Sequence, residues 1–264
     1  MRQFVVTVRV DEVELASDAL WGLGVVAIEE RSLDNTTVEL WTSLGDDAVE
    51  SDAVLPWPAR FVEVDEAVAD TWRQFAEPIW VAPDLVVRPA WVPFDAPDGV
   101  TVLHIEPGAT FGMGDHPTTI LSLRAARRLV TPGCSVIDVG CGSGVLAIAA
   151  CLFGARHAVG IDIAPAAVPT TTGNAVANAV ADRIEVSTTD LADVDGTYDI
   201  VLANILAPTL VALSADLARV VAPGGALVIS GILAAGHAHV LEALLPLQVV
   251  ATDEMNGWVA ITLR

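Results

Sequence analysis

The feature that most constrains the fold of this chain is a short apolar run that leads directly into a glycine-rich turn. Residues 135–139 predict a buried strand, residues 140–144 (Gly-Cys-Gly-Ser-Gly) a tight turn, and residues 143–153 a helix. Glycines let the backbone turn sharply and let a ligand approach it closely. This order of elements favours an α/β protein with a ligand site at the turn, and a packing turn without a ligand is the alternative. The Gly-x-Gly-x-x-Gly pattern of dinucleotide-binding proteins does not fit, because residue 145 is Val.

Strands and helices alternate from about residue 100 to the end of the chain. Strands are predicted at 100–105, 135–139, 157–161, 183–187, 198–203, 226–230, 247–252 and 257–263. Helices are predicted between most of them, at 118–129, 143–153, 165–178, 208–221 and 234–244. Alternation of this kind predicts a doubly wound, mostly parallel sheet with helices on both faces. The dipeptide Asn256-Gly257 predicts a tight turn, so the last strand is expected to run antiparallel.

The first 64 residues follow a different pattern. The predicted order is β-α-β-β-α-β, which is that of a small ferredoxin-like α+β domain, with strands at 3–10, 25–31, 36–42 and 60–64 and helices at 11–20 and 45–55. Residues 65–99 contain five prolines and predict a linker that is helical at 66–75 and extended beyond. We therefore expect a domain at 1–64, a linker at 65–99 and an α/β domain at 100–264.

Two polar residues follow predicted strands of the α/β domain. Asp162 comes directly after the strand 157–161 and 22 residues after Gly140. At the end of this strand a carboxylate can accept hydrogen bonds from both hydroxyls of a ribose. Asn204 follows the strand at 198–203 and can reach into the crevice outside the carboxyl ends of the strands, where open α/β sheets bind ligands. Each residue could instead cap the helix that follows it.

The segment Phe111-Gly112-Met113-Gly114-Asp115-His116-Pro117-Thr118-Thr119 leads into a predicted helix. Thr118 or Thr119 is expected to cap that helix through its hydroxyl group. Backbone N–H groups point outward at such a helix start and suit a polar ligand group. His116 is expected to be a structural, hydrogen-bonding residue, with a titrating role as the alternative.

Four segments together resemble the class I S-adenosylmethionine-dependent methyltransferases, and specifically the PrmA family, which methylates the eleventh protein of the large ribosomal subunit. They are residues 111–119, 140–149, 160–163 and 203–207, and residues 224–225 and 230–233 also match. The resemblance implies an α/β fold in which a doubly wound seven-stranded sheet is preceded by a small, here shortened, ferredoxin-like substrate-recognition domain. It implies S-adenosylmethionine as cofactor, with contacts from Thr119, Gly140, Gly142, Gly144, Asp162 and Asn204.

The activity implied by this resemblance is N-methylation of lysine, and of α-amino groups, in a ribosomal protein. Asn204 is the candidate catalytic residue, at the edge where cofactor and acceptor amine meet, and neither a general acid/base pair nor a metal is expected. A methyltransferase of another protein lysine, such as that of an electron-transfer flavoprotein, is the closest alternative. An NAD-dependent oxidoreductase and a catalytically silent binding protein on the same fold are more distant alternatives.

Charge and composition narrow the range of partners. The chain has 34 acidic residues against 13 cationic ones, all arginine, which gives a net charge of −21. Such a surface repels phosphate backbones, so a basic ribosomal protein is expected as partner and a nucleic acid is not. The longest strongly apolar run, 145–153, is too short to cross a membrane, and three cysteines without a paired motif fit a reduced, cytoplasmic protein. The sequence leaves the oligomeric state open.

Overall fold

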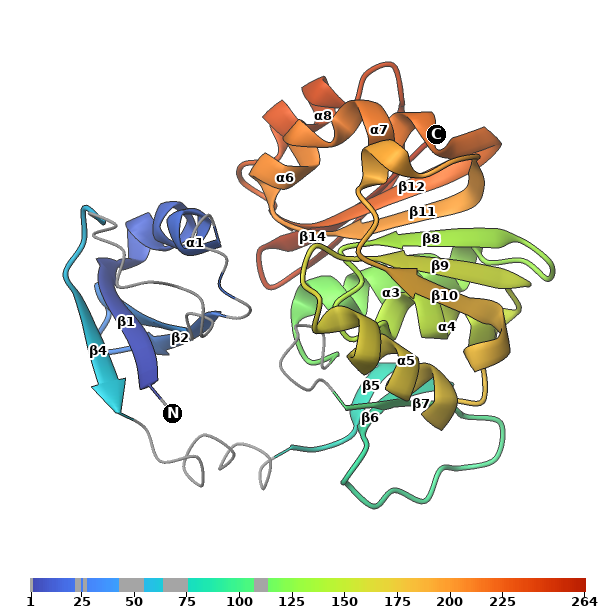
Figure 1. The fold of residues 1–264 in the computed structure, drawn as a ribbon, viewed down its shortest axis with the longest axis horizontal. Coiled ribbons are helices and arrows are strands. Elements are labelled where there is room, and N and C mark those ends of the chain that lie inside the picture. The colour runs from blue at the N-terminus through green and yellow to red at the C-terminus, as the bar shows by residue number, and fades with distance from the viewer. Residues whose placement is uncertain (1, 22–24, 26–27, 43–54, 64–75, 107–113) are drawn as a thin grey trace. The chain divides into compact units, whose positions relative to one another are not determined.

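The computed structural model describes residues 2–21, 25, 28–42, 55–63, 76–106 and 114–264. The chain forms two compact units, Met1–Ala76 and Glu77–Arg264, whose elements are labelled in Figure 1. The helices predicted at 45–55 and 66–75 fall outside the described residues, apart from residue 55. Within the described ranges, no helix is long and apolar enough to cross a membrane.

As far as it is described, the N-terminal unit is a four-stranded antiparallel sheet with a helix on one face (Figure 1). In chain order its elements are β1 (Arg2–Arg9), α1 (Val13–Trp21), β2 (Ile28–Ser32), β3 (Thr37–Thr42) and β4 (Ala59–Glu63). The strand order β2-β3-β1-β4 is that of a ferredoxin-like module. Side chains alternate between the two faces of a strand, so the core forms on the face that carries α1, from Val6, Val8, Val38 and Leu40 with Ala16 and Leu20.

The described part of the C-terminal unit is built on a seven-stranded sheet, which confirms the doubly wound fold predicted from the sequence (Figure 1). Its strands are β8 (Ser135–Val139), β9 (His157–Ile161), β10 (Ile184–Ser187), β11 (Tyr198–Asn204), β12 (Val221–Leu233), β13 (Val249–Met255) and β14 (Trp258–Leu263). The order is β10-β9-β8-β11-β12-β14-β13, with parallel pairing from β10 to β12. The predicted antiparallel last strand is confirmed, because β14 runs antiparallel to both β12 and β13.

The direction of winding changes at β8. The chain proceeds from β8 to β9 and β10 on one side, and then to β11 and β12 on the other. A crevice forms at the carboxyl ends of the strands where the winding direction changes. The carboxyl ends of β8, β9 and β11 carry the glycine turn, Asp162 and Asn204. The sheet therefore brings these predicted site residues to one edge.

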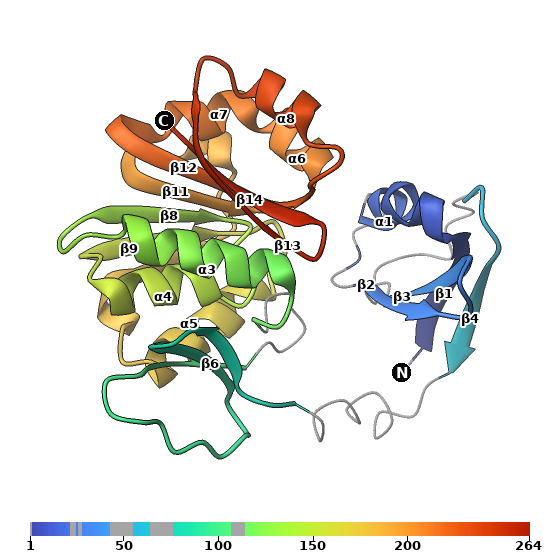
Figure 2. The same ribbon diagram turned by 180° about the vertical axis from the view of Figure 1, so that it is seen from behind.

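Described helices cover both faces of the large sheet (Figures 1 and 2). On one face lie α3 (Pro117–Leu129), α4 (Val145–Phe153) and α5 (Ala167–Ala177). On the other face lie α6 (Ala207–Ala212), α7 (Ser214–Arg219) and α8 (Ala238–Ala243). The helix predicted at 208–221 is thus two short helices, and β12 begins at Val221, before the glycines at 224 and 225 that were expected to precede it.

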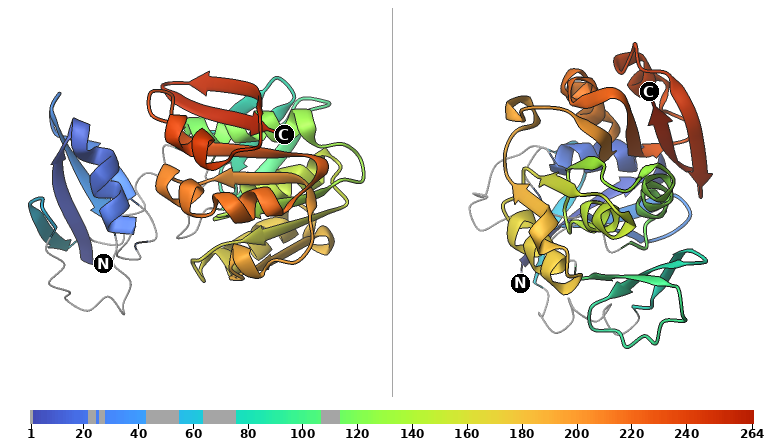
Figure 3. Two further views of the ribbon diagram at one scale, coloured as in Figure 1. Left: turned by 90° about the horizontal axis from the view of Figure 1, so that it is seen from above. Right: turned by 90° about the vertical axis from the view of Figure 1, so that its right-hand side faces the viewer.

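Residues 77–99 differ from the expected extended linker. They contain β5 (Ile79–Ala82) and β6 (Leu85–Pro89), which form a three-stranded sheet with β7 (Thr101–Ile105) in the described chain. The strand predicted at 100–105 therefore belongs to this small sheet. Prolines are tolerated because Pro78 precedes β5, Pro83 lies in the turn and Pro89 ends β6. The small sheet forms a separate layer beside α5 (Figure 3) and packs into the core of α3 and α4.

Candidate functional site

The glycine turn between β8 and α4 has a left-handed backbone at each of its glycines. Gly140, Gly142 and Gly144 have φ angles of 75°, 52° and 79°, which residues with a side chain rarely adopt. The N–H groups of Gly140 and Cys141 both donate to the carbonyl of Ile161, at 2.9 and 3.0 Å. The N–H of Gly144 donates to the carbonyl of Cys141 at 2.7 Å. The turn is therefore a fixed structure attached to the end of β9.

Asp162 joins this turn to the segment that follows β9. Its Oδ2 accepts a hydrogen bond from the N–H of Gly142 at 2.8 Å, and its Oδ1 accepts one from the N–H of Ala164, also at 2.8 Å. Asp162 does not cap α5, because the N-cap of that helix is Ala166. Each carboxylate oxygen can accept a further hydrogen bond, and the side chain is only partly buried, so a ligand with hydroxyl groups can still bind to it.

Asn204 and Thr119 meet although they come from β11 and α3. The Nδ2 of Asn204 donates to the Oγ1 of Thr119 at 3.5 Å, and Thr119 is fully buried. The Oδ1 of Asn204 is also buried and has no hydrogen-bond partner among the described residues. Asn204 does not cap α6, whose N-cap is Leu206. A buried carboxamide oxygen without a donor is costly, which is typical of a site that a ligand completes.

Ile205, the residue after Asn204, is wedged between two glycines. A Cβ on Gly140 would lie 2.4 Å from the Cγ2 of Ile205, and a Cβ on Gly231 would lie 2.5 Å from the Ile205 carbonyl oxygen. Only glycine at these two positions allows the chain after β11 to lie between the glycine turn and β12. The contact therefore fixes Asn204 beside the turn.

The start of α3 is capped by His116, and not by Thr118 or Thr119 as the sequence predicts. Pro117 occupies the first position of the helix, which places the cap one residue earlier. The Nδ1 of His116 lies 2.7 Å from the Oγ1 of Thr118, and its ring contacts Trp258 edge-on, with centroids 5.0 Å apart. Burial lowers the pKa of His116, which favours the neutral form of the ring. This geometry supports the structural interpretation of His116.

Two further residues at the site are not identified by the sequence patterns. Asp138, on β8, is 1% exposed; its Oδ2 accepts a hydrogen bond from the N–H of Ala147 at 3.1 Å, and its Oδ1 has no partner in the described part of the chain. Burial, with a smaller effect from the charge of Asp162, raises the pKa of Asp138 to about 7. Ile163 is 97% exposed, which is unusual for a large apolar side chain. Asp138 could have been found from the sequence, because an acidic residue inside a predicted buried strand is unusual. No sequence pattern predicts the exposure of Ile163.

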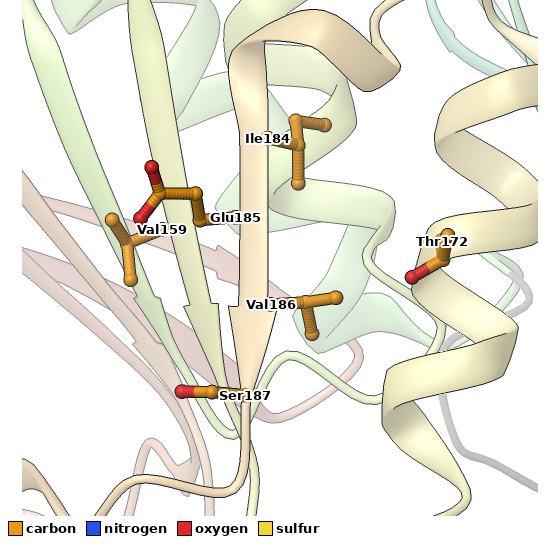
Figure 4. Close-up of a pocket in the computed structure, with 6 residues that line it drawn as sticks. All are labelled: Val159, Thr172, Ile184, Glu185, Val186 and Ser187. Atoms are coloured by element: carbon orange, nitrogen blue, oxygen red, sulfur yellow. The ribbon is translucent and has the colours of Figure 1, made fainter.

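A hollow of about 440 Å³ lies elsewhere, along the outer edge of β10 (Figure 4), and is lined by Val159, Thr172, Ile184, Glu185, Val186 and Ser187. Figure 4 shows Ile184 and Val186 on the side of β10 that faces Thr172, and Glu185 on the opposite side. The hollow therefore straddles an edge strand and is not one concave site. Its lining includes none of the predicted site residues.

Comparison with known proteins identifies the family. Residues 58–264 match the family model described as ribosomal protein L11 methyltransferase (PrmA). The chain belongs to this family. A relative named ribosomal protein L11 methyltransferase, from Geobacter sulfurreducens, is 43% identical over 224 residues, which cover 84% of this chain and 74% of the relative. A relative of the same name from Geobacter metallireducens is 45% identical, over 74% of this chain and 64% of the relative.

The PrmA family also accounts for the fold. The crystal structure of a ribosomal protein L11 methylase from Lactobacillus delbrueckii subsp. bulgaricus is similar to this chain with a TM-score of 0.67 and 29% identity. The similarity covers 72% of this chain and 98% of that one. The match to the PrmA model includes the glycine turn, Asp162 and Asn204, and it begins in the N-terminal unit. The resemblance to this family found in the sequence is confirmed.

Proposed function

We propose that this chain is an S-adenosylmethionine-dependent methyltransferase that acts on ribosomal protein L11. The observation that carries the proposal is the grouping of Asp162, Asn204 and Thr119 around a glycine turn, in a member of the PrmA family. The family name specifies the methylated protein, and the site offers a place for the cofactor.

The residues at the site fit S-adenosylmethionine. Two buried oxygens at the site, the Oδ1 of Asn204 and the Oδ1 of Asp138, lack partners among the described residues. A carboxamide oxygen and an ionised carboxylate both accept hydrogen bonds, and the cofactor carries a sulfonium cation and an ammonium group. Its ribose has two hydroxyls, for which Asp162 keeps unused lone pairs. Its adenine ring is flat, and the exposed Ile163 offers it an apolar surface. Thr119, Gly140, Gly142 and Gly144 complete the proposed contacts.

The cofactor supplies an activated methyl group when it is bound, because its sulfur is positively charged. The chain itself has to hold the acceptor amine in line with that methyl group and to exclude water. Orientation of this kind can lower a barrier by about 7–11 kcal/mol in ideal cases. Asn204 is proposed to orient the amine through its Oδ1, which accepts an amine N–H and so directs the nitrogen lone pair. No general acid or base is assigned.

The acceptors are proposed to be lysine side chains, and α-amino groups, of L11. A lysine reacts only when it is neutral, so apolar surroundings that lower its pKa favour transfer. The N-terminal unit is proposed to recognise the protein substrate, and the net charge of −21 favours encounter with a basic ribosomal protein. The proposed location is the cytoplasm, where ribosomal proteins are synthesised.

The test is methyl transfer from labelled S-adenosylmethionine to purified L11, followed by mass spectrometry of the labelled residues. We expect label on lysine or α-amino nitrogens, and none with Asn204→Ala. Label on another protein of a cell lysate, with L11 unlabelled, would favour a different protein-lysine methyltransferase. Binding of NAD in place of S-adenosylmethionine would favour the oxidoreductase.

A further inference from the structure

Helix α5 presents a face of buried polar side chains. Thr171, Asn174 and Asn178 occupy one helical face and are 0%, 3% and 8% exposed. Polar side chains are buried at low cost only when they are hydrogen-bonded. All three bond to backbone groups of neighbouring segments, which lie at β7 and at the glycine turn.

The two asparagines hydrogen-bond to backbone N–H and carbonyl groups along the outer edge of β7 and the residue that follows it. Asn178 accepts from the N–H of His104 at 2.9 Å and donates to the carbonyl of the same residue at 2.7 Å. Asn174 makes the same pair of bonds with Glu106, at 2.9 and 2.8 Å. The spacings match because four residues of helix rise about 6 Å and two residues of strand about 6.6 Å. Helix α5 is thereby tied to the end of β7 (Figure 1).

Asn174 differs from Asn178 in its third hydrogen bond, which goes to the glycine turn. Its Nδ2 also donates to the carbonyl of Ser143 at 2.9 Å. The third bond of Asn178 goes to the carbonyl of Asn174, within the same helix, at 2.8 Å. The Oγ1 of Thr171 donates to the preceding carbonyl of the turn, that of Gly142, at 3.0 Å. Two consecutive carbonyls of the turn are therefore held by α5.

These bonds determine how the peptide groups of the turn are oriented. The N–H of Gly142 is bound to Asp162 and its carbonyl to Thr171, so both peptide groups at residue 142 are fixed. Glycine offers little resistance to rotation of its backbone, because it has no side chain. The shape of the turn consequently depends on α5 as well as on its own sequence.

We propose that Asn174 and Thr171 are positioning residues that hold the glycine turn in the shape that binds S-adenosylmethionine. The inference rests on the proposed function, because it takes the turn to be the cofactor site. Neither residue has to touch the cofactor. Asn174 also links the turn to Glu106, so the turn and the small sheet keep a fixed relation.

Asn178 provides a matched control for Asn174. Asn174→Ala removes two hydrogen bonds to Glu106, just after β7, and Asn178→Ala removes two to His104 in β7, but only the first releases the carbonyl of Ser143. By isothermal titration calorimetry, we expect the demethylated product S-adenosylhomocysteine to bind about tenfold more weakly to Asn174→Ala than to Asn178→Ala. The two variants should lose similar thermal stability. Equal affinities in the two variants would overturn the proposal.

Thr171→Val and Thr172→Val form a second pair, which keeps side-chain volume. The Oγ1 of the exposed Thr172 bonds within its own helix, to the carbonyl of Val168 at 2.8 Å. We expect weaker binding, by about threefold or more, only in Thr171→Val. If Asn174→Ala does not fold, this pair decides, and unchanged affinity in Thr171→Val overturns the positioning role. Wild-type protein that binds no S-adenosylhomocysteine would refute the proposed function itself, and the inference with it.

Discussion

The Nδ2 of Asn204 lies 3.5 Å from the Oγ1 of Thr119, a residue 85 positions earlier in the chain. This bond joins the end of β11 to the first turn of α3. It uses the donor side of the Asn204 carboxamide and leaves the oxygen without a partner among the described residues. The site therefore contains a polar atom whose burial lowers stability until a ligand binds to it.

Asn204→Leu should abolish methyl transfer while lowering the free energy of unfolding less than Asn178→Leu does. An unpaired buried acceptor costs about 1–3 kcal/mol, and leucine removes it at similar volume. Asn178→Leu is the control, because its carboxamide is fully bonded, and it should destabilise by about 2 kcal/mol or more. Urea unfolding and a transfer assay measure both effects. Retained transfer in Asn204→Leu would remove this residue from the mechanism.

Asp162→Ala should raise the Kd for S-adenosylhomocysteine at least about tenfold. The substitution removes the proposed ribose acceptor and also the bond that holds the N–H of Gly142, and hydrogen bonds to a charged group are worth about 1.5–3 kcal/mol. Asp34→Ala is a suitable control, since Asp34 accepts a comparable local bond from the N–H of Thr36, at 2.7 Å, in the N-terminal unit. Calorimetry that finds the same Kd in both variants would contradict the assignment.

The free energy of unfolding should decrease as the pH rises from about 4 to about 7, because of Asp138. Burial raises the pKa of Asp138 to about 7, above its value of about 4 in the unfolded chain, so in this range the folded protein holds a proton that the unfolded chain has lost. The free energy of unfolding then decreases by at most about 1.4 kcal/mol per pH unit. Asp138→Asn should flatten this slope. Asp199→Asn should change it only at lower pH, since its bonds to Ser135 lower the pKa of Asp199.

Gly231→Ala should be more destabilising than Gly224→Ala by about 2 kcal/mol or more. Both glycines have positive φ angles, of 84° and 78°, so both substitutions carry a strain of about 1–2 kcal/mol. Only the Cβ at 231 meets backbone, the carbonyl of Ile205 at 2.5 Å, whereas no described atom lies within 4 Å of a Cβ at 224. Thermal unfolding of the pair measures the difference. Similar losses would show that Ile205 is not wedged.

The charge of the first 100 residues should accelerate the encounter with L11. They hold 20 acidic residues against 6 arginines, and complementary charge acts mainly on association. We expect kcat/KM for L11 to fall with added salt while kcat changes little, because the Debye length shortens from about 10 Å at 0.1 M to about 3 Å at 1 M. Neutral residues at Asp46, Asp47, Glu50 and Asp52, which lie outside the described residues, should flatten this dependence. If kcat/KM depends on salt in the same way in that variant, the four acidic residues are only solvated and do not accelerate the encounter with L11.

Much of the fold could be predicted because its signals are local. The strand–turn–helix around residue 140, and the alternation that follows it, specify a doubly wound sheet, and Asn256-Gly257 specifies the antiparallel end. Two strands of the small sheet, β5 and β6, could not be predicted. They are four and five residues long, and the prolines at 78, 83 and 89 beside them are typical of extended chain outside regular secondary structure.

The site is predictable only in part, for a related reason. Asp162 and Asn204 stand at strand ends, where the topology alone brings them together. The bonds that fix the turn from α5 join residues 29 and 31 positions apart, and those to β7 span 68 and 74 positions. No local pattern specifies such pairs. The unusual exposure of Ile163 also depends on tertiary structure alone.

The asparagine pair on α5 has a consequence for self-association. The outer strand of a sheet can recruit a strand from another molecule, which begins aggregation. At β7 the backbone groups of His104 and Glu106 that would form such a pairing are already bonded to side chains of the same chain. One of the two outer strands of the large sheet, β10, is short instead and carries the exposed Glu185. Loss of both asparagines would therefore leave unpaired backbone groups at the edge of β7. Newly synthesised chains could then associate through this edge before the α/β domain has folded.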